Sequence, residues 1–402
     1  MRSAEALLAS AVLALAACDD PGDDALTRCE ATFVLPAAVQ TDILFVIDDS
    51  GSMAGEQANV SANLGAFVQA LNDSPVANDY QIGVTNTSVA GFASDDVTYV
   101  AGPNDGLGFP AGRLLAVDPA SGVYSYTTGP RILAPASPTF IEDFQANVVV
   151  GTDGTGKEQP FLAARLALSD RIADGSNAGL LRPGARLAVI FISDEDDCTD
   201  PDGVISSVPL QGGAACHDPA KKALLESIPS FVSFLRGPLA GEARDVVVAA
   251  IVGLDLVTLE PSCGDSGNAW CAPTTDTCTT AYDKGDRFVA LLDALGAAAT
   301  IRDSVCDASF GSSLEAIAGL IVPDTMPLEG APADWRMLAV TVTKAAGATV
   351  ACEVALDGPS IPPTADAIYT PPQVGGPATL TFQGDCTLAQ GDRVDVRIVC
   401  AG

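Results

Sequence analysis

The sequence predicts an α/β fold, in which a doubly wound, mostly parallel and Rossmann-like sheet precedes a small β-rich C-terminal module. Short continuous apolar runs at 43–47, 187–192 and 246–252 are typical of strands that are covered on both faces. Segments in which apolar residues recur at helical spacing lie between these runs. Because parallel strands need long crossover connections, this alternation indicates a parallel sheet with helices on both faces.

The other elements of the sheet region follow in chain order. Apolar residues recur at helical spacing from Val60 to Leu71, and Tyr80, Ile82 and Val84 alternate with polar or small residues as in a strand. A Gly- and Pro-rich stretch from about 90 to 147 shows little periodicity. The remaining patterns predict a strand at 148–150 and helices at 161–168, 224–235 (with a kink at Pro229), 288–295 and 314–321.

The composition changes between 323 and 334. Beyond this point, short alternating apolar segments separated by Pro and Gly predict strands near 337–342, 350–356, 378–382 and 394–399. A module of about 70 residues has a small core, so we expect disulfides to brace it. The expected division of the chain is 1–18 signal peptide, 19–38 acidic tether and lead-in, 39–325 sheet domain and 331–402 C-terminal module.

The N-terminus predicts export. The apolar run at 6–17 would reach only about 18 Å as a helix, which is too short to cross a bilayer, and it fits a signal peptide. It ends in Leu15-Ala16-Ala17-Cys18, which resembles the bacterial lipobox. That resemblance implies cleavage before Cys18, lipidation of this cysteine and a place in the cell envelope, periplasmic or cell-surface. The alternative is an ordinary signal peptide with an incidental cysteine.

Charge and cysteine content narrow the function further. With 51 acidic and 20 basic residues the net charge is −31, which disfavours nucleic acid as a partner. The single histidine disfavours imidazole-based catalysis and His-rich metal sites. Eleven cysteines indicate an oxidising compartment, and setting Cys18 aside leaves an even number for disulfides. Cys198 and Cys216 bracket one long loop and are the expected pair there.

Acidic and hydroxyl side chains follow two of the predicted buried strands, and hydroxyls occupy a third loop. The first strand runs into Asp48-Asp49-Ser50-Gly51-Ser52, and the strand at 187–192 runs into Ser193-Asp194. Another loop, Gly151-Thr152-Asp153-Gly154-Thr155-Gly156, follows the strand predicted at 148–150 and stands before a predicted helix. Because the carboxyl ends of parallel strands meet at one edge of the sheet, folding can bring these loops together.

This order of motifs resembles the von Willebrand factor type A (vWA) domain with its metal-ion-dependent adhesion site, in a bacterial secreted form, over about 41–322. The resemblance implies a metal site made of Asp48, Ser50, Ser52, Thr152 and Asp194, with Thr155 as the alternative to Thr152. It also implies adhesion or complex assembly without catalysis. On its own, Asp-x-Ser-x-Ser is a common acidic turn.

The chemistry of the motif agrees with a small hard dication, for which Mg²⁺ is expected and Ca²⁺ or Mn²⁺ are alternatives. Such ions prefer oxygen ligands, and Mg²⁺ keeps several waters. Serine hydroxyls two residues apart can bind directly, while Asp48 and Asp194 balance the charge and leave one coordination position for a partner. The following run, Glu195 to Asp197, is expected to be a solvated acidic loop, with a second ion such as Ca²⁺ as the alternative.

The sequence thus predicts a lipid-anchored binding protein that holds a protein or other acidic ligand through a divalent metal, and not an enzyme. One alternative is a structural envelope protein whose metal only stabilises the fold. Another is a metal-dependent hydrolase, for which no motif supplies a general base. The partner, the oligomeric state and the role of the 90–147 segment stay open.

Overall fold

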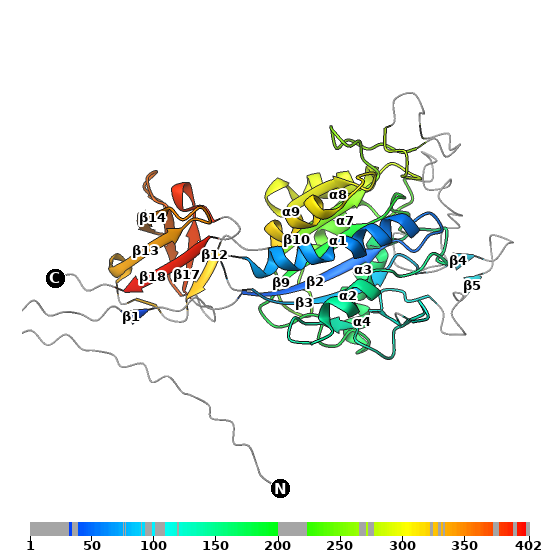
Figure 1. The fold of residues 1–402 in the computed structure, drawn as a ribbon, viewed down its shortest axis with the longest axis horizontal. Helices are drawn as coiled ribbons and strands as arrows, with labels where there is room; N and C mark the ends of the chain where they lie inside the picture. The colour runs from blue at the N-terminus through cyan, green and yellow to red at the C-terminus, as the bar shows by residue number, and fades with distance from the viewer. Residues whose placement is uncertain are drawn as a thin grey trace, which may run out of the picture.

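The computed structural model describes the residues 32–33, 39–74, 76, 78–89, 91–92, 99–100, 109–118, 120–199, 223–264, 271, 277–321, 325–328, 331–332, 334–372, 378–388 and 392–398. Within them the chain is a mixed α/β protein with a mostly parallel six-stranded central sheet and smaller sheets near the C-terminus (Figure 1). In spatial order the central strands are β11 (Thr300–Ser304), β10 (Val246–Val252), β9 (Arg186–Ile192), β2 (Val39–Ile47), β3 (Asn78–Asn86) and β8 (Ile132–Leu133). Only β8 runs antiparallel to its neighbour in this sheet.

Side chains of β2 alternate between two apolar cores, one on each face of the sheet. Ile43, Phe45 and Ile47 belong to the first core, which also contains residues of three helices: α1 (Ala54–Asn72), α2 (Phe140–Asn147) and α9 (Gly311–Ile321). Leu44 and Val46 belong to the second core, together with α3 (Pro160–Leu168), α7 (Ile228–Leu235) and α8 (Asp286–Leu295). Burial on both faces explains why these strands read as continuous apolar runs.

The chain order of the strands creates a switch point in the middle of the sheet. From β2 the chain moves to β3 on one side and later returns to place β9 on the other side. Ile47 and Ile192, the last residues of β2 and β9, are register partners, and the Asp48 N–H donates to the Ile192 carbonyl at 2.9 Å. Ligands of open α/β sheets bind where the strand order reverses in this way. The residues that follow β2 and β9 therefore lie where a ligand is expected.

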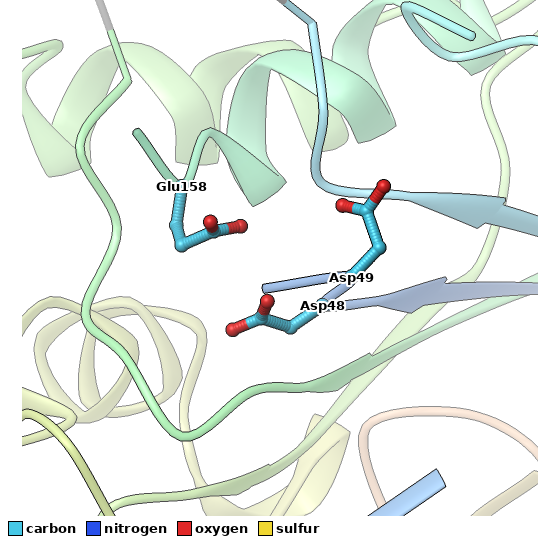
Figure 2. A group of neighbouring side chains, drawn as sticks. All are labelled: Asp48, Asp49 and Glu158. Atoms are coloured by element: carbon cyan, nitrogen blue, oxygen red, sulfur yellow. The ribbon is translucent and has the colours of Figure 1, made fainter. Parts of the chain in front are cut away.

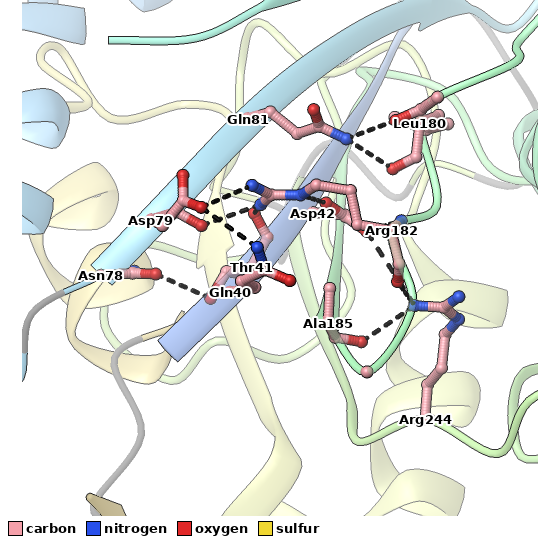
Figure 3. Close-up of polar contacts among 12 residues, drawn as sticks. Gln40, Thr41, Asp42, Asn78, Asp79, Gln81, Leu180, Arg182, Ala185 and Arg244 are labelled. Carbon is pink, nitrogen blue, oxygen red and sulfur yellow. Dashed lines mark hydrogen bonds and ion pairs between the residues drawn. The ribbon is translucent and has the colours of Figure 1, made fainter. Parts of the chain in front are cut away.

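At the opposite end of β2, a buried ion pair fixes the strand (Figure 3). Asp42 is fully buried, and its two oxygens accept the Arg182 backbone N–H and Nε–H, each at 2.7 Å. Arg182 also donates to the Thr41 and Asp79 carbonyls, so one side chain links β2 to β3. Arg244 lies 3.9 Å from Asp42 and donates to the carbonyl of Ala185.

Two small sheets form the C-terminal part (Figure 1). Their shared core also contains Val76 and contacts Val39, so this part packs beside the start of β2. Two strands come from unexpected places: β1, in the predicted lead-in, pairs with β18, and β12, at the predicted domain limit of 325, pairs with β17. The strands are β1 (Thr32–Phe33), β18 (Arg393–Ile398), β13 (Leu338–Thr343) and β14 (Thr349–Cys352) in one sheet, and β12 (Thr325–Leu328), β17 (Ala378–Phe382), β16 (Ala367–Thr370) and β15 (Val354–Leu356) in the other.

Short elements complete the described part of the chain. Two small sheets, each made of a pair of two-residue strands, lie within the Gly- and Pro-rich stretch. One-turn helices join the longer elements. These short elements are β4 (Gly91–Phe92) with β5 (Tyr99–Val100), β6 (Ala116–Val117) with β7 (Tyr124–Ser125), α4 (Asp170–Ala173), η1 (Ala297–Ala299), η2 (Trp335–Met337) and η3 (Gly384–Cys386).

Two elements predicted for the sheet region differ from the structure, and the strand predicted near 350–356 is divided into β14 and β15, which lie in different sheets. Residues 148–150 are not a strand: the Val148 N–H donates to the Phe144 carbonyl at 3.1 Å, so the segment closes the last turn of α2. Burial alternates along the segment: Val148 and Val150 lie in the core, whereas Val149 is exposed. The helix predicted at 224–235 begins only at Ile228, and Pro229 lies in its first turn, where no backbone N–H is needed, so it causes no kink.

Disulfides connect several of the described loops. They join Cys263 to Cys271, Cys278 to Cys306, and Cys352 to Cys386. Cys198 is also disulfide-bonded, but Cys216, its predicted partner, and Cys18 lie outside the described residues. These bonds fit an exported or extracellular protein. No helix in the described ranges combines the length and apolarity needed to span a bilayer.

Candidate metal centre

The loop after β2 and the loop after β9 form one hydrogen-bonded chain of oxygens. Ser50 Oγ and Ser52 Oγ share a hydrogen bond of 3.1 Å, and Ser52 Oγ donates to Asp194 Oδ1, also at 3.1 Å. Asp48 joins the chain through the Ser50 N–H, which donates to its Oδ1 at 2.7 Å. We call Asp48, Ser50, Ser52 and Asp194 the outer group, because Ser52 is exposed while the other three are buried.

Ser193 holds the Asp48 carboxylate from the β9 side. Its hydroxyl donates to Asp48 Oδ2 at 2.6 Å and accepts the Glu195 N–H at 3.1 Å. The adjacent residue, Asp194, is thereby directed towards Ser52. Four of the residues predicted to bind a metal therefore lie together at the switch point, although the loops come from positions about 140 residues apart.

The Gly151–Thr155 loop reaches the same place through α1. Gln57 Nε2 donates to the Asp48 carbonyl at 2.8 Å and to the Gly151 carbonyl at 2.7 Å, while Gln57 Oε1 accepts the Gly151 N–H at 3.2 Å. Gly151 has φ +90°, a conformation that favours glycine. Gln57 is not among the site residues that the sequence motifs predict. Its signal was a polar residue on the buried stripe of α1, three positions before Val60.

The two candidate threonines occupy different environments. The Thr152 carbonyl faces Gly51, 4.0 Å from where a Cβ would stand, so Thr152 borders the turn that carries Ser50 and Ser52. Thr155 is buried, donates its N–H to Ser88 Oγ at 2.9 Å, and accepts the Lys157 N–H at its Oγ1. The choice of Thr152 over Thr155 as a metal ligand stays a prediction.

A second group of carboxylates lies behind the outer group. Asp48, Asp49 and Glu158 are all buried, and each offers an oxygen within 4.8 Å of the others, so they could hold a metal ion. Figure 2 shows Glu158, which comes from the loop before α3, facing Asp48 at the end of β2. We call these three residues the inner group. Asp48 is common to both groups.

Asp49 also fixes the surrounding loops. Its carboxylate accepts hydrogen bonds from Asn86 Nδ2 at 2.6 Å and Ser88 Oγ at 2.8 Å, and Thr87 Oγ1 lies 3.2 Å from Asp49 Oδ1. Its carbonyl accepts the Gly154 N–H at 2.8 Å. A Cβ on Gly154 would lie 2.4 Å from Asp49 Cγ, so only glycine permits this approach. The β2, β3 and Gly151–Thr155 loops are thus packed against one carboxylate.

Burial raises the pKa of five carboxyl groups around Asp48. It raises the pKa of Asp49 to about 7 and that of Asp194 to about 8, and in both cases the nearby Asp48 charge adds to the effect. For Glu158 and Glu195, burial and then the Asp48 charge raise the pKa well above its usual value. Burial also raises the pKa of Asp48 itself. Without a cation, the site therefore favours protonated carboxyl groups.

Unpaired polar atoms concentrate here as well. Among the described residues, five buried side-chain nitrogen or oxygen atoms without a hydrogen-bond partner belong to Asn86, Glu158, Gln159 and Asp194. Buried polar atoms are normally paired, so such a concentration needs an explanation. Carboxylate oxygens without donors, such as Asp194 Oδ2 and Glu158 Oε1, fit a divalent cation.

The acidic run after Asp194 is not the solvated loop that was expected. Glu195, Asp196 and Asp197 are all buried. Asp197 accepts the Phe161 N–H at the start of α3 and pairs with the Arg287 guanidinium at 2.9 Å, and Asp196 accepts the Arg287 N–H. These two residues connect β9 to α3 and α8. Glu195 instead adds negative charge beside Asp48 and Asp194.

No family model and no curated protein matches the chain. Several solved structures are similar to it at low identity. Proximal thread matrix protein 1 from the mussel byssus is 14% identical over 71% of this chain and 48% of its own, with a TM-score of 0.28. The pilus adhesin SpaC from Lactobacillus rhamnosus GG is 11% identical over 91% and 39%, with a TM-score of 0.41.

Manganese-loaded TRAP protein from Plasmodium vivax is 12% identical over 73% of this chain and 77% of its own, with a TM-score of 0.28. The present chain thus spans less than half the length of the first two proteins. All three TM-scores lie below 0.5, so these likenesses do not identify a family.

Proposed function

We propose that this chain is an exported binding protein of the vWA type that holds a partner through a divalent cation at the outer group. One observation carries the proposal: three oxygens, from Ser50, Ser52 and Asp194, are hydrogen-bonded in sequence at the switch point, and Ser52 opens this group to solvent. A cation there would be held from inside and reachable from outside. That combination suits a bridge between two molecules.

The oxygen spacing supports a small ion. In an octahedral shell with metal–oxygen distances of about 2.1 Å, neighbouring oxygens are about 3.0 Å apart. The two hydrogen-bonded spacings in the outer group are both 3.1 Å. Mg²⁺ is the proposed ion on this basis, with Mn²⁺ and Ca²⁺ as alternatives, and Thr152 or Thr155 as a further ligand. The bound ion supplies a positive centre on which an external oxygen can bind.

A carboxylate on a protein or another acidic ligand is the proposed partner group. The net charge of −31 opposes an acidic partner at long range. Exposed charges are screened beyond about 8 Å at physiological salt, so direct contact with the ion decides binding. The same proposal includes a lipid anchor at Cys18 and a place in the cell envelope. It includes no catalysis, because no sequence motif supplies a general base.

A cation-dependent binding measurement tests the function. A displayed peptide library is screened on the purified protein with Mg²⁺ and with EDTA, and each selected peptide is remade with its Asp or Glu replaced by Asn or Gln. We expect binding that requires both Mg²⁺ and the carboxylate. Ser52→Ala should weaken it, whereas Ser233→Ala, an exposed serine on α7, serves as the matched control. Binding that persists in EDTA would contradict the proposal.

The same protein samples distinguish the proposed binding function from two alternative functions. A structural envelope protein would be stabilised by the cation and yet select no peptide. A metal-dependent hydrolase would show turnover in an activity screen that Ser50→Ala abolishes.

A further inference from the structure

We infer that the inner group of Asp48, Asp49 and Glu158 is a second divalent-cation site, closed to solvent and sharing Asp48 with the outer group. It does not depend on the proposed function, because a buried cation can stabilise the loops whether or not a partner binds outside. Its ligand chemistry is that of an oxygen-preferring dication bound by three carboxylates.

The position of Glu158 is the first argument. Glu158 is 1% exposed, and only its Oε2 has a donor, the Thr87 hydroxyl. Its Oε1 is buried with no donor, and the carboxyl faces Asp48 within hydrogen-bonding reach, so that a proton or a cation must lie between the two groups (Figure 2). Burying an unpaired carboxylate oxygen is costly, and a cation between Glu158 and Asp48 would remove that cost.

The charge of the region is the second argument. Five buried carboxyl groups influence one another around Asp48: Asp48, Asp49, Glu158, Asp194 and Glu195. Across the part of the chain that the structure describes, no Lys or Arg forms an ion pair with any of the five, whereas nearby Asp197 is paired with Arg287. When all five are ionised, one divalent cation offsets two of the five negative charges, and two cations offset four. The five carboxylates therefore carry more negative charge than one ion at the outer group offsets.

Accessibility distinguishes the two sites. All three inner residues are buried, so no oxygen of a partner can complete the coordination shell of a cation there. A closed cage of protein carboxylates suits Ca²⁺, which accepts six to eight oxygens at about 2.3–2.6 Å, better than Mg²⁺, which retains waters. We therefore assign Ca²⁺ to the inner group and leave Mg²⁺ for the outer group.

Metal counting tests the inference on the full exported chain. The protein is dialysed against Ca²⁺ and Mg²⁺ together, passed through a desalting column, and analysed for both elements. We expect two divalent ions per wild-type chain, one of them Ca²⁺. Glu158→Gln should lose the Ca²⁺ and keep the other ion, Ser52→Ala should keep the Ca²⁺, and the double variant should lose both. Circular dichroism confirms that each variant is folded.

Glu195→Gln is the matched control, because it removes a buried carboxylate of the same region that is not one of the three inner ligands. We expect it to retain both ions. A single ion per wild-type chain overturns the inference without requiring any variant to fold. Loss of the same ion in Glu158→Gln and Ser52→Ala, or loss of Ca²⁺ in Glu195→Gln, also overturns it. Peptide binding in Mg²⁺ should survive Glu158→Gln, so failure of the inner site and failure of the proposed function are separate results.

Discussion

The two ends of β2 both bury carboxylates, but they balance the charge differently. At the start of the strand, Asp42 is paired with Arg182 at 2.7 Å and lies near Arg244 (Figure 3). At the far end, Asp48 and Asp49, which Figure 2 shows, accept hydrogen bonds from neutral groups and have no ion pair among the described residues. The chain thus provides its own cation at one end, and we propose that an external cation serves the other. Removal of divalent ions should therefore affect the far end and leave the paired end unchanged.

The largest effect is expected at the paired end. Arg182→Met removes the main partner of Asp42, and leaving a buried carboxylate without its ion pair costs about 3–5 kcal/mol. Urea unfolding should show this loss equally in EDTA and in Mg²⁺ plus Ca²⁺. Asp42→Asn with Arg182→Met should recover part of it. A loss that depends on divalent ions would break the distinction between the two ends.

Chelation should give the next largest effect, at the unpaired end. A cation present at 100 times its dissociation constant stabilises the folded state by about 2.7 kcal/mol. Thermal unfolding of the wild type should therefore shift downward in EDTA, and Asp48→Ala should abolish the shift because both groups use Asp48. A wild-type melting temperature that ignores EDTA would contradict both metal sites.

The response to pH sharpens the comparison. The folded-state pKa values of Asp49, about 7, and Asp194, about 8, exceed the unfolded values, so these groups stabilise the fold below the unfolded pKa. That stability is lost as the pH rises from the unfolded pKa through the folded values of about 7 and 8, because the unfolded chain ionises over this range while the buried groups stay protonated. Urea unfolding in EDTA should show the decline between pH 5 and 9, and saturating cation should reduce it. An increase in the stability of the metal-free protein over this range would contradict the predicted direction of the pH dependence.

The smallest effect on stability is expected for Ser52→Ala. Ser52 is exposed, and surface substitutions usually change stability by less than about 0.5 kcal/mol. In EDTA the variant should unfold like the wild type, while titration calorimetry should show weaker Mg²⁺ binding. Equal Mg²⁺ affinity in the variant would remove Ser52 from the outer site.

Much of the sheet could be predicted because burial on both faces leaves a strong sequence signal. The run at 246–252 coincides with β10, and 187–192 falls one residue short of β9. By contrast, β11 has the sequence TIRDS and lies at the sheet edge, where a strand needs few apolar residues. It could not be recognised from apolar periodicity. The three valines at 148–150 gave a wrong strand prediction, because Val148 and Val150 pack on the core although the segment pairs with no strand.

The same contrast applies to the site. Asp48 and Asp194 could be placed together because they follow buried parallel strands. Glu158 belongs to a loop before α3, and its approach to Asp48 depends on loop contacts that no local pattern encodes. The burial of Asp197 likewise depends on Arg287, 90 residues further along the chain. A polar residue on an apolar helix stripe, as at Gln57, was the one local signal that went unused.

The lengthwise course of β2 has a mechanical consequence. The strand runs from the C-terminal core, which Val39 contacts, to the cation loop at Asp48 (Figure 1). It is paired with β3 along all of its length and with β9 along most of it. Under the proposed function, a pull on the bound partner that is directed along the axis of β2 acts parallel to these two ladders. It therefore loads their hydrogen bonds together in shear and does not peel them apart one at a time.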